Sequence, residues 1–128
     1  MNVKDYPHQA ALLKDFDPNR LTQEVIGIGE SWADADCAAS SLEETRKTLL
    51  ATLQLEYMLE GAGGKPMPVA QSEMRALADP RYEQHLELMV QARKESNRMR
   101  VRYDLGRMRL ELFRSLQATM RQEMQLNR

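Results

Sequence analysis

Two long stretches of the chain repeat apolar residues at alternating steps of four and three, the spacing of one face of an α-helix. The second stretch opens with Asp79-Pro80, a capping residue followed by proline at the first helical position. It contains no further proline and a single glycine, Gly106. The pattern predicts a helix over 80–125 whose apolar face includes Leu86, Tyr103, Gly106 and Phe113.

The first stretch begins in the same way, with Asp17-Pro18, and ends at a run of glycines that starts with Gly61. Glycines 27 and 29 weaken its first turns, so a break near Gly29 is an open alternative. The pattern predicts a helix over 19–60 whose apolar face includes Trp32, Ala35, Ala39 and Leu53.

The segment between the two helices is expected to reverse the chain. Glycine and proline exclude regular structure over 61–68, and a short helix is expected over 69–78, with Met74 and Leu77 closing the open end of the hairpin. Lys65 precedes a proline, whereas a phosphate-binding loop needs Ser or Thr there. The predicted fold class is all-α: a long antiparallel, coiled-coil-like helical hairpin with a short connecting helix.

The reversal also predicts which residues face each other. With this connection, residues whose numbers add up to about 140 lie opposite one another in the antiparallel pair. Trp32 is then opposite Gly106, and Leu53 is opposite Leu86. A glycine at 106 would make room for the indole, because large side chains pack against small ones in a dense core.

Acidic and basic residues are segregated along the chain, although the net charge is only −1. Acids dominate residues 15–44, and arginine recurs every seven residues from Arg93 to Arg121. Residues at heptad spacing share one flank of a helix, so the register pairs Arg107 with Asp36 and Arg100 with Glu43. It leaves Arg114 and Arg121 without an acid.

Arginine on the second helix is the one candidate for a binding function. The alternative is that these arginines pair with acids of the same hairpin or of a dimer partner. No aromatic residues are interleaved for base stacking, so contact with nucleic acid would be electrostatic and weakly sequence-selective. The candidate partner-binding or phosphate-binding residues are Arg98, Arg102, Arg109, Arg114 and Arg121.

The sequence does not contain the groups of residues that catalysis or metal binding would need. The chain has two histidines and one cysteine, and no nucleophile is paired with a base. His85 has Glu83 and Glu87 on either side, but residues two apart do not share a helix face, so it is expected to be a surface residue. No enzymatic activity, metal or cofactor is expected.

Composition suits a helical protein outside the membrane. Aromatic residues make up 5% of the chain, and helix formers dominate its second half. The single cysteine fits a reducing compartment, the N-terminus lacks the apolar core of a signal peptide, and no run approaches about 20 apolar residues. We expect a cytoplasmic protein that does not enter the membrane.

Apolar residues outside the paired faces point to a larger assembly. A two-helix hairpin would leave them exposed, and a homodimer forming a four-helix bundle would cover them. The alternative is a three-helix monomer in which an N-terminal arm, residues 1–18, and residues 69–78 cover them. The residues in question are Leu50, Tyr57, Leu88, Val90, Met108, Leu112 and Leu116.

Two segments resemble small helical proteins that tailed bacteriophages encode in their early and recombination regions: WADADCAASSLEETRKTLLATLQLEYM and RYEQHLELMVQARKESNRMRVRYDLGRMRLELFRSLQATMRQEM. The resemblance carries no catalytic residue. It implies a non-enzymatic accessory or adaptor protein in DNA recombination or replication, which acts in the host cytoplasm by binding another phage or host protein. An inhibitor of a host defence or host enzyme and a structural assembly component are the alternatives.

Overall fold

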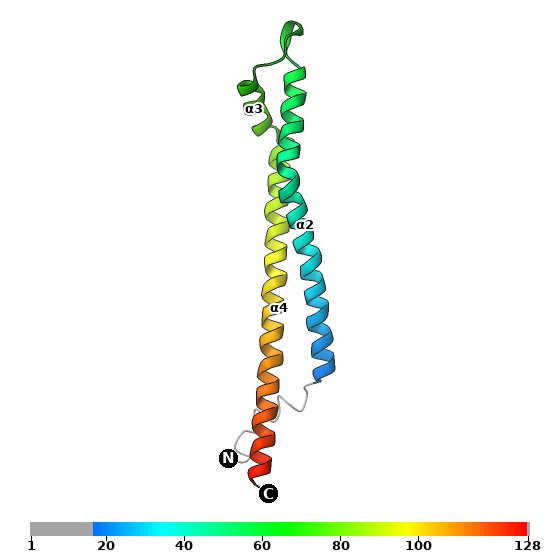
Figure 1. The fold of residues 1–128 in the computed structure, drawn as a ribbon, viewed down its shortest axis with the longest axis vertical. Coiled ribbons are helices and arrows are strands. Elements are labelled where there is room, and N and C mark those ends of the chain that lie inside the picture. The colour runs from blue at the N-terminus through cyan, green and yellow to red at the C-terminus, as the bar shows by residue number, and fades with distance from the viewer. Residues whose placement is uncertain (1–16, 128) are drawn as a thin grey trace. The chain divides into compact units, whose positions relative to one another are not determined.

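The computed structural model describes residues 17–127. Residues 1–16 of the predicted N-terminal arm, 1–18, therefore lie outside the described residues. The described residues form helices and no strand. Helix α2 spans Pro18–Leu59, the 3-10 turn η2 spans Ala62–Gly64, α3 spans Val69–Leu77 and α4 spans Pro80–Leu126 (Figure 1). The predicted all-α class is confirmed. Helix α4 begins at Pro80 as expected, and the other three ends of the two long helices differ by one residue from the expected bounds.

Both long helices begin at the predicted caps. The Asp17 carboxylate accepts hydrogen bonds from the backbone N–H groups of Asn19 at 3.0 Å and Arg20 at 3.2 Å. The Asp79 carboxylate accepts one from the backbone N–H of Arg81 at 2.7 Å. These bonds satisfy N–H groups that have no partner within the helix, which is why an aspartate before a proline starts a helix here.

Helix α2 continues through both of its glycines, so the alternative of a break near Gly29 is wrong. It ends at the glycine run for steric reasons. A Cβ at Gly61 would collide with the carbonyl oxygen of Lys65. Gly63 and Gly64 have φ values of 69° and 74°, the left-handed region that glycine enters at little cost.

The chain divides into two compact units, and each long helix contributes to both. Within the described residues, unit 1 combines 17–32 with 98–127. In it, the start of α2 packs antiparallel against the C-terminal part of α4. Leu21, Val25 and Phe113 are buried there, and their partly buried neighbours are Tyr103, Leu110 and Leu116.

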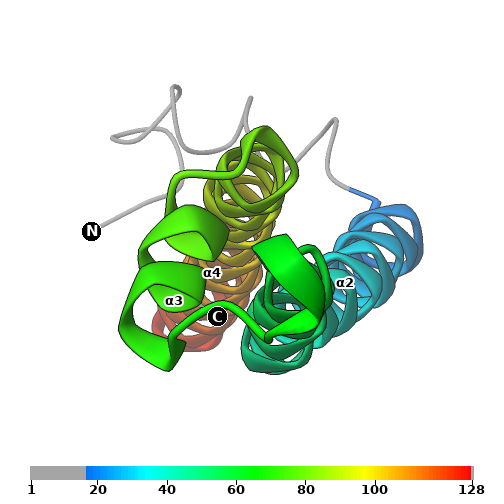
Figure 2. The ribbon, with the colours of Figure 1, turned by 90° about the horizontal axis from the view of Figure 1, so that it is seen from above.

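Unit 2 comprises Ala33–Asn97 and contains α3. Its core is built on Leu53, Ala76 and Tyr82, which come from α2, α3 and α4 respectively. Helix α3 lies beside both long helices in this unit (Figure 2). The partly buried residues packed on this core are Leu49, Leu50, Tyr57 and Leu86.

Helix α3 turns its small residues inward. Ser72 and Ala76 are fully buried, whereas Met74 is 71% exposed and Leu77 is 49% exposed. The expectation that Met74 and Leu77 close the hairpin is therefore wrong. The small side chains of serine and alanine allow α3 to pack closely on the core of unit 2. The larger apolar side chains of α3 therefore face away from the core.

The predicted register in unit 1 is also wrong. Tyr103 packs on Trp32, with ring centroids 5.6 Å apart and ring planes at 37°. The edge of the same tyrosine ring lies 3.1 Å from where a Cβ of Gly29 would be. Gly106 faces Val25 instead of Trp32, and a Cβ at 106 would lie 2.8 Å from the Val25 Cγ2. Each helix thus uses a glycine to accept a bulky residue of the other: Gly106 of α4 accepts Val25, and Gly29 of α2 accepts Tyr103.

Several apolar residues expected to be exposed are in fact covered within their own unit. Leu50 and Tyr57 pack on the core of unit 2, and Leu116 packs on the core of unit 1. The others remain exposed: Leu88 by 57%, Val90 by 65%, Met108 by 62% and Leu112 by 57%. Over residues 17–127, no helix has the length and apolar character needed to cross a membrane.

Candidate interaction surfaces on α4

The five candidate arginines, Arg98, Arg102, Arg109, Arg114 and Arg121, are all exposed on α4 in unit 1, but they do not form one surface. Arg102 and Arg109 border a shallow hollow between α4 and the start of α2. Arg114 and Arg121 follow Arg107 at seven-residue steps and so share its flank of the helix. Helical periodicity puts these two rows on opposite edges of the face that packs on α2.

The first row, Arg98, Arg102 and Arg109, lies beside apolar neighbours. The Arg109 guanidinium is 5.7 Å from the centre of the Phe113 ring, a cation–π distance. Arg98 and Arg102 make no hydrogen bond or ion pair within residues 17–127. Glu24, which also borders the hollow, pairs at 3.5 Å with Arg20 of its own helix. This row therefore keeps unpaired positive charge.

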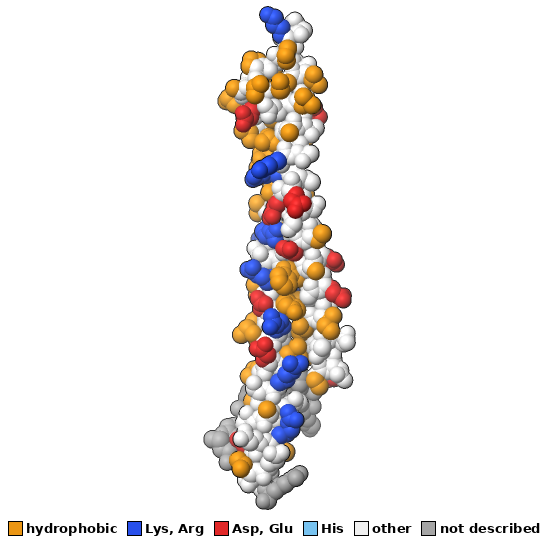
Figure 3. Space-filling view, viewed as in Figure 1, with side chains coloured by type: hydrophobic (Ala, Val, Ile, Leu, Met, Phe, Trp, Pro, Cys, Tyr) orange, Lys and Arg blue, Asp and Glu red, His pale blue; other side chains and the backbone are white. Residues whose placement is uncertain are grey.

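The second row contains Arg107, Arg114 and Arg121. The Arg107 guanidinium lies 5.9 Å from the centre of the Tyr103 ring, and the Arg121 Nε donates to the Gln117 carbonyl at 3.4 Å. Arg114 makes neither a hydrogen bond nor an ion pair in the described part of the chain. Figure 3 shows basic side chains in a row along α4 in this unit, with acidic side chains next to them.

The predicted ion pairs Arg107–Asp36 and Arg100–Glu43 are wrong, because Arg93 takes both acids. Its Nη1 lies 2.6 Å from the Asp36 Oδ1, and its Nε lies 2.9 Å from the Glu43 Oε1. Buried Ser96 donates a hydrogen bond to Asp36 at 3.2 Å. Hydrogen bonds from the Arg93 guanidinium hold the pKa of both carboxyl groups below their usual values.

A second polar cluster in unit 2, formed by Glu56, Tyr57, Asp79 and Arg81, stabilises the start of α4. The Arg81 guanidinium reaches the Glu56 carboxylate at 2.8 Å and the buried Asp79 carboxylate at 3.1 Å. The Tyr57 hydroxyl donates to Asp79 at 2.7 Å. Together, Arg81 and then Tyr57 hold the Asp79 pKa far below its usual range. The sequence indicated Asp79 as a cap but contained no local signal for its partner Tyr57, which is distant along the chain.

His85 is half-buried and has a structural partner, so its expected surface position is wrong. Its Nε2 lies 2.7 Å from the Leu42 carbonyl oxygen. A carbonyl only accepts hydrogen bonds, so Nε2 carries the proton and donates. Among the described residues, no group of three or more His, Cys, Asp or Glu side chains could hold a metal ion, and Cys37 is exposed.

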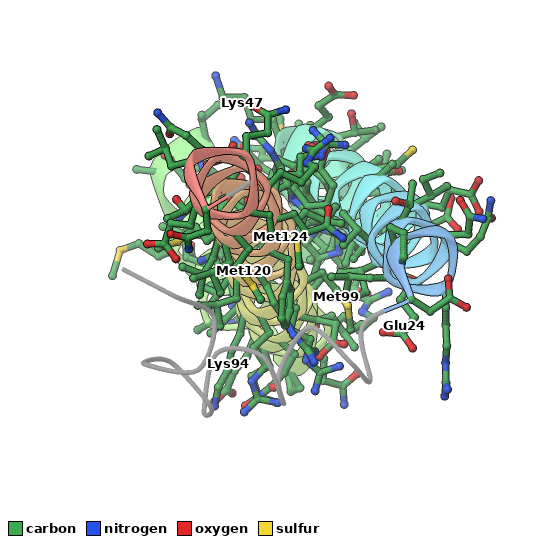
Figure 4. The ribbon with its side chains drawn as sticks, turned by 90° about the horizontal axis from the view of Figure 1, so that it is seen from below. Glu24, Lys47, Lys94, Met99, Met120 and Met124 are labelled. Atoms are coloured by element: carbon green, nitrogen blue, oxygen red, sulfur yellow. The ribbon has the colours of Figure 1, made fainter. Side chains whose placement is uncertain are left out.

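The residues expected on the paired faces are placed as follows. Ala39, Leu53 and Phe113 are buried, and Trp32, Ala35, Leu86, Tyr103 and Gly106 are partly buried. Met99 and Met124 extend from α4 on the side where α2 lies in unit 1 (Figure 4). Sequence reasoning missed one feature of α4: a second apolar row, Val101, Leu105, Met108 and Leu112, whose members are 53–62% exposed. Of these four residues, the sequence pattern predicts exposure for Met108 and Leu112 alone.

The fold and these surfaces describe an all-α protein with two separate cores and with exposed apolar and basic rows on one helix. Comparison of the chain with protein-family models, with curated proteins and with solved structures finds no match.

Proposed function

We propose that this protein is a non-enzymatic adaptor that acts by binding other macromolecules through the α4 surface of unit 1. The observation that carries the proposal is the combination of an exposed apolar row with arginines that pair with no acid within residues 17–127. Exposed apolar side chains in a continuous row mark association surfaces, and arginine is enriched where proteins bind partners.

The resemblance to helical proteins from bacteriophage early regions supports a role in DNA recombination or replication, in the cytoplasm of the host. In this role the partner is another phage or host protein, and the adaptor itself forms a homodimer. The exposed apolar residues of α4 support this self-association.

A second candidate activity is weak contact with the nucleic-acid backbone. Arg98, Arg102 and Arg114 have no partner within residues 17–127, so their charge is available to phosphate groups. Such contacts are sequence-independent and weaken steeply with salt, because binding releases counterions from the nucleic acid.

The nucleic-acid activity is tested by fluorescence anisotropy with single-stranded and double-stranded DNA at low salt. The Arg114→Glu/Arg121→Glu variant is expected to weaken binding by about tenfold or more and to flatten the salt dependence. The matched control is Arg46→Glu/Lys47→Glu, which changes the net charge equally on exposed residues of unit 2. An equal loss in both variants excludes a defined site at Arg114 and Arg121, and no binding by the natural chain excludes the nucleic-acid activity altogether.

The adaptor role is tested by capture with the tagged chain from phage-infected and uninfected cells. Recombination or replication proteins in the captured fraction support the adaptor. A captured host enzyme whose activity falls in the complex would favour the inhibitor, and capture of virion components alone would favour the structural component.

A further inference from the structure

Four residues of α4 in unit 1, Val101, Leu105, Met108 and Leu112, form one continuous apolar stripe. They follow each other at steps of four, three and four residues, and each is more than half exposed. This is the spacing of a two-helix seam, in which each residue packs between residues of a facing helix. Val101, Met108 and Leu112 lie away from the face of α4 that packs on α2, which carries Tyr103, Gly106 and Phe113. Leu105 lies at the edge of that face, where it also lines the hollow beside the start of α2.

Charged residues flank this stripe in a fixed order. If Leu105 and Leu112 take the a positions of a heptad and Val101 and Met108 take the d positions, each edge of the stripe carries one sign of charge. The e positions are then held by Arg102 and Arg109, and the g positions by Asp104 and Glu111.

This order of charges selects one orientation for a second copy. In an antiparallel pair, e faces e and g faces g, so Arg102 would meet Arg109 of the second copy and Asp104 would meet its Glu111. In a parallel pair, each g residue faces the e residue five positions further along the second helix. Asp104 then meets Arg109 of the second copy, and symmetry repeats the contact.

We propose that this stripe is the self-association surface of the protein, and that two copies meet on it in parallel and in register. The inference rests on the proposed self-association and adds its surface and its orientation. The next a position upstream is Arg98, which would meet its own copy, and the next d position downstream is Ser115. The seam is therefore confined to two heptads, and the dimer is weak and depends on concentration.

The surface is tested by sedimentation equilibrium of the full chain between about 1 µM and 1 mM, the range expected for a small interface. Leu105→Asp is expected to weaken dimerisation by about tenfold or more, because it places a charge in the centre of the seam. The matched control is Leu55→Asp, which adds the same charge at a leucine of unit 2 that is 58% exposed. It is expected to change the dissociation constant by less than about twofold.

These outcomes separate the surface from self-association itself. A dimer that Leu105→Asp leaves intact overturns the stripe and leaves self-association standing. A natural chain that remains monomeric throughout the range overturns both. A monomer whose melting temperature falls in Leu112→Asp, at a stripe residue that does not border the hollow beside α2, and not in Leu55→Asp, places another segment of the same chain on the stripe and also overturns the proposal.

The orientation is tested with single cysteines in a Cys37→Ser background, oxidised with diamide. In the parallel pair, residue 112 meets residue 112 of the second copy, so Leu112→Cys is expected to form a disulfide-linked dimer. Arg114→Cys, on another side of α4, is the control for random collision. A link that forms only when Val101→Cys and Leu112→Cys chains are mixed would show the antiparallel pair and overturn the orientation.

A substitution at Arg98, the next a position upstream of the seam, tests the register of the parallel pair independently. Arg98→Leu replaces the like charges that meet in the parallel pair with an apolar contact and adds a layer to the seam. It is expected to tighten the dimer by about tenfold or more. An unchanged dissociation constant would contradict the position assigned to Arg98.

Discussion

Val25 packs its Cγ2 methyl group against the backbone of Gly106, and a Cβ at position 106 would lie 2.8 Å from that methyl. Real Cβ atoms essentially never come so close to another heavy atom, so this contact sets how near α2 and α4 lie in unit 1. Tyr103 makes the reciprocal contact on α2, where its ring fills the space beside Gly29. The two glycines allow the helices of this unit to pack closely at the cost of helix propensity.

Gly106→Ala is expected to destabilise unit 1 by about 1 kcal/mol, because overpacking against Val25 outweighs the gain in helix propensity. The measurement is urea unfolding followed by the fluorescence of Trp32, the single tryptophan, which lies in this unit. Adding Val25→Ala is expected to recover part of the loss, with a coupling energy above about 0.5 kcal/mol.

Gly27→Ala is the matched control on the same helix pair. Apart from the adjoining backbone of its own helix, no atom of residues 17–127 lies within 4 Å of a Cβ built at Gly27, so this substitution meets open space. It is expected to stabilise the chain by about 0.5–1 kcal/mol through helix propensity alone. Stabilisation by both glycine variants would show that Val25 does not constrain residue 106.

Leu53→Ala is expected to destabilise unit 2 by about 2–5 kcal/mol, the cost of lost burial together with a cavity. Leu53, on α2, is 1% exposed and packs against α3 and the start of α4. Leu55→Ala, at a leucine of the same helix that is 58% exposed, is expected to cost less than about 1 kcal/mol. The measurement is urea unfolding followed by circular dichroism, and equal losses would contradict a core centred on Leu53.

Asp79→Asn is expected to lower the melting temperature at pH 7 and to remove part of the acid sensitivity of the protein. Asparagine keeps the cap of α4 but loses the ion pair with Arg81. The Asp79 pKa is lowered in the folded state, so its contribution is complete above its ordinary value of 3.8 and is lost as the pH falls toward the folded value. The difference between the two proteins should therefore shrink below about pH 4.

The measurement is a series of thermal melts between pH 7 and pH 2. Tyr57→Phe is the companion variant, because it removes the hydroxyl that donates to Asp79 and leaves Arg81 in place. It is expected to show part of the same change. A difference between Asp79→Asn and the natural chain that stays constant with pH would contradict the role of the ionised carboxylate.

The starts and ends of the helices could be predicted from the sequence because their causes are local. An aspartate before a proline and a run of glycines act within a few residues of where they stand. The register could not be predicted in the same way. It depends on the reciprocal fit of Val25 with Gly106 and of Tyr103 with Gly29, and on an α3 that packs through Ser72 and Ala76.

The candidate arginines illustrate the same limit. Arg114 and Arg121 belong to the heptad-spaced series that starts at Arg93, which the sequence shows directly. Which flank of α4 each row of arginines occupies depends on which face of this helix meets α2. The acidic partners of Arg93 also follow from the register and not from the charge pattern. The second apolar stripe was within reach of sequence reasoning, because Val101, Leu105, Met108 and Leu112 repeat at heptad steps one face away from the first.

Arg93→Gln is expected to destabilise unit 2 more than Arg100→Gln, the matched control one heptad further along α4. Arg93 holds two carboxylates through hydrogen bonds of 2.6–3.0 Å, whereas Arg100 makes no ion pair or hydrogen bond within residues 17–127. Removing Arg93 also removes the cause that lowers the pKa values of Asp36 and Glu43. Both carboxyl pKa values should rise in Arg93→Gln and stay unchanged in Arg100→Gln, as measured by NMR titration of the side-chain carboxyl carbons.

The folded-state pKa values of both acids lie below their ordinary values of 3.8 and 4.5. Their pairing with Arg93 therefore contributes above about pH 4.5 and is lost as the pH falls below it. Thermal melts of Arg93→Gln and of the natural chain should accordingly converge toward low pH. They should also converge as salt is raised, because these side chains are partly exposed and their attraction is screened. If Arg100→Gln has the larger effect instead, Glu43 pairs with Arg100 as in the register predicted from the sequence, and its assignment to Arg93 is wrong.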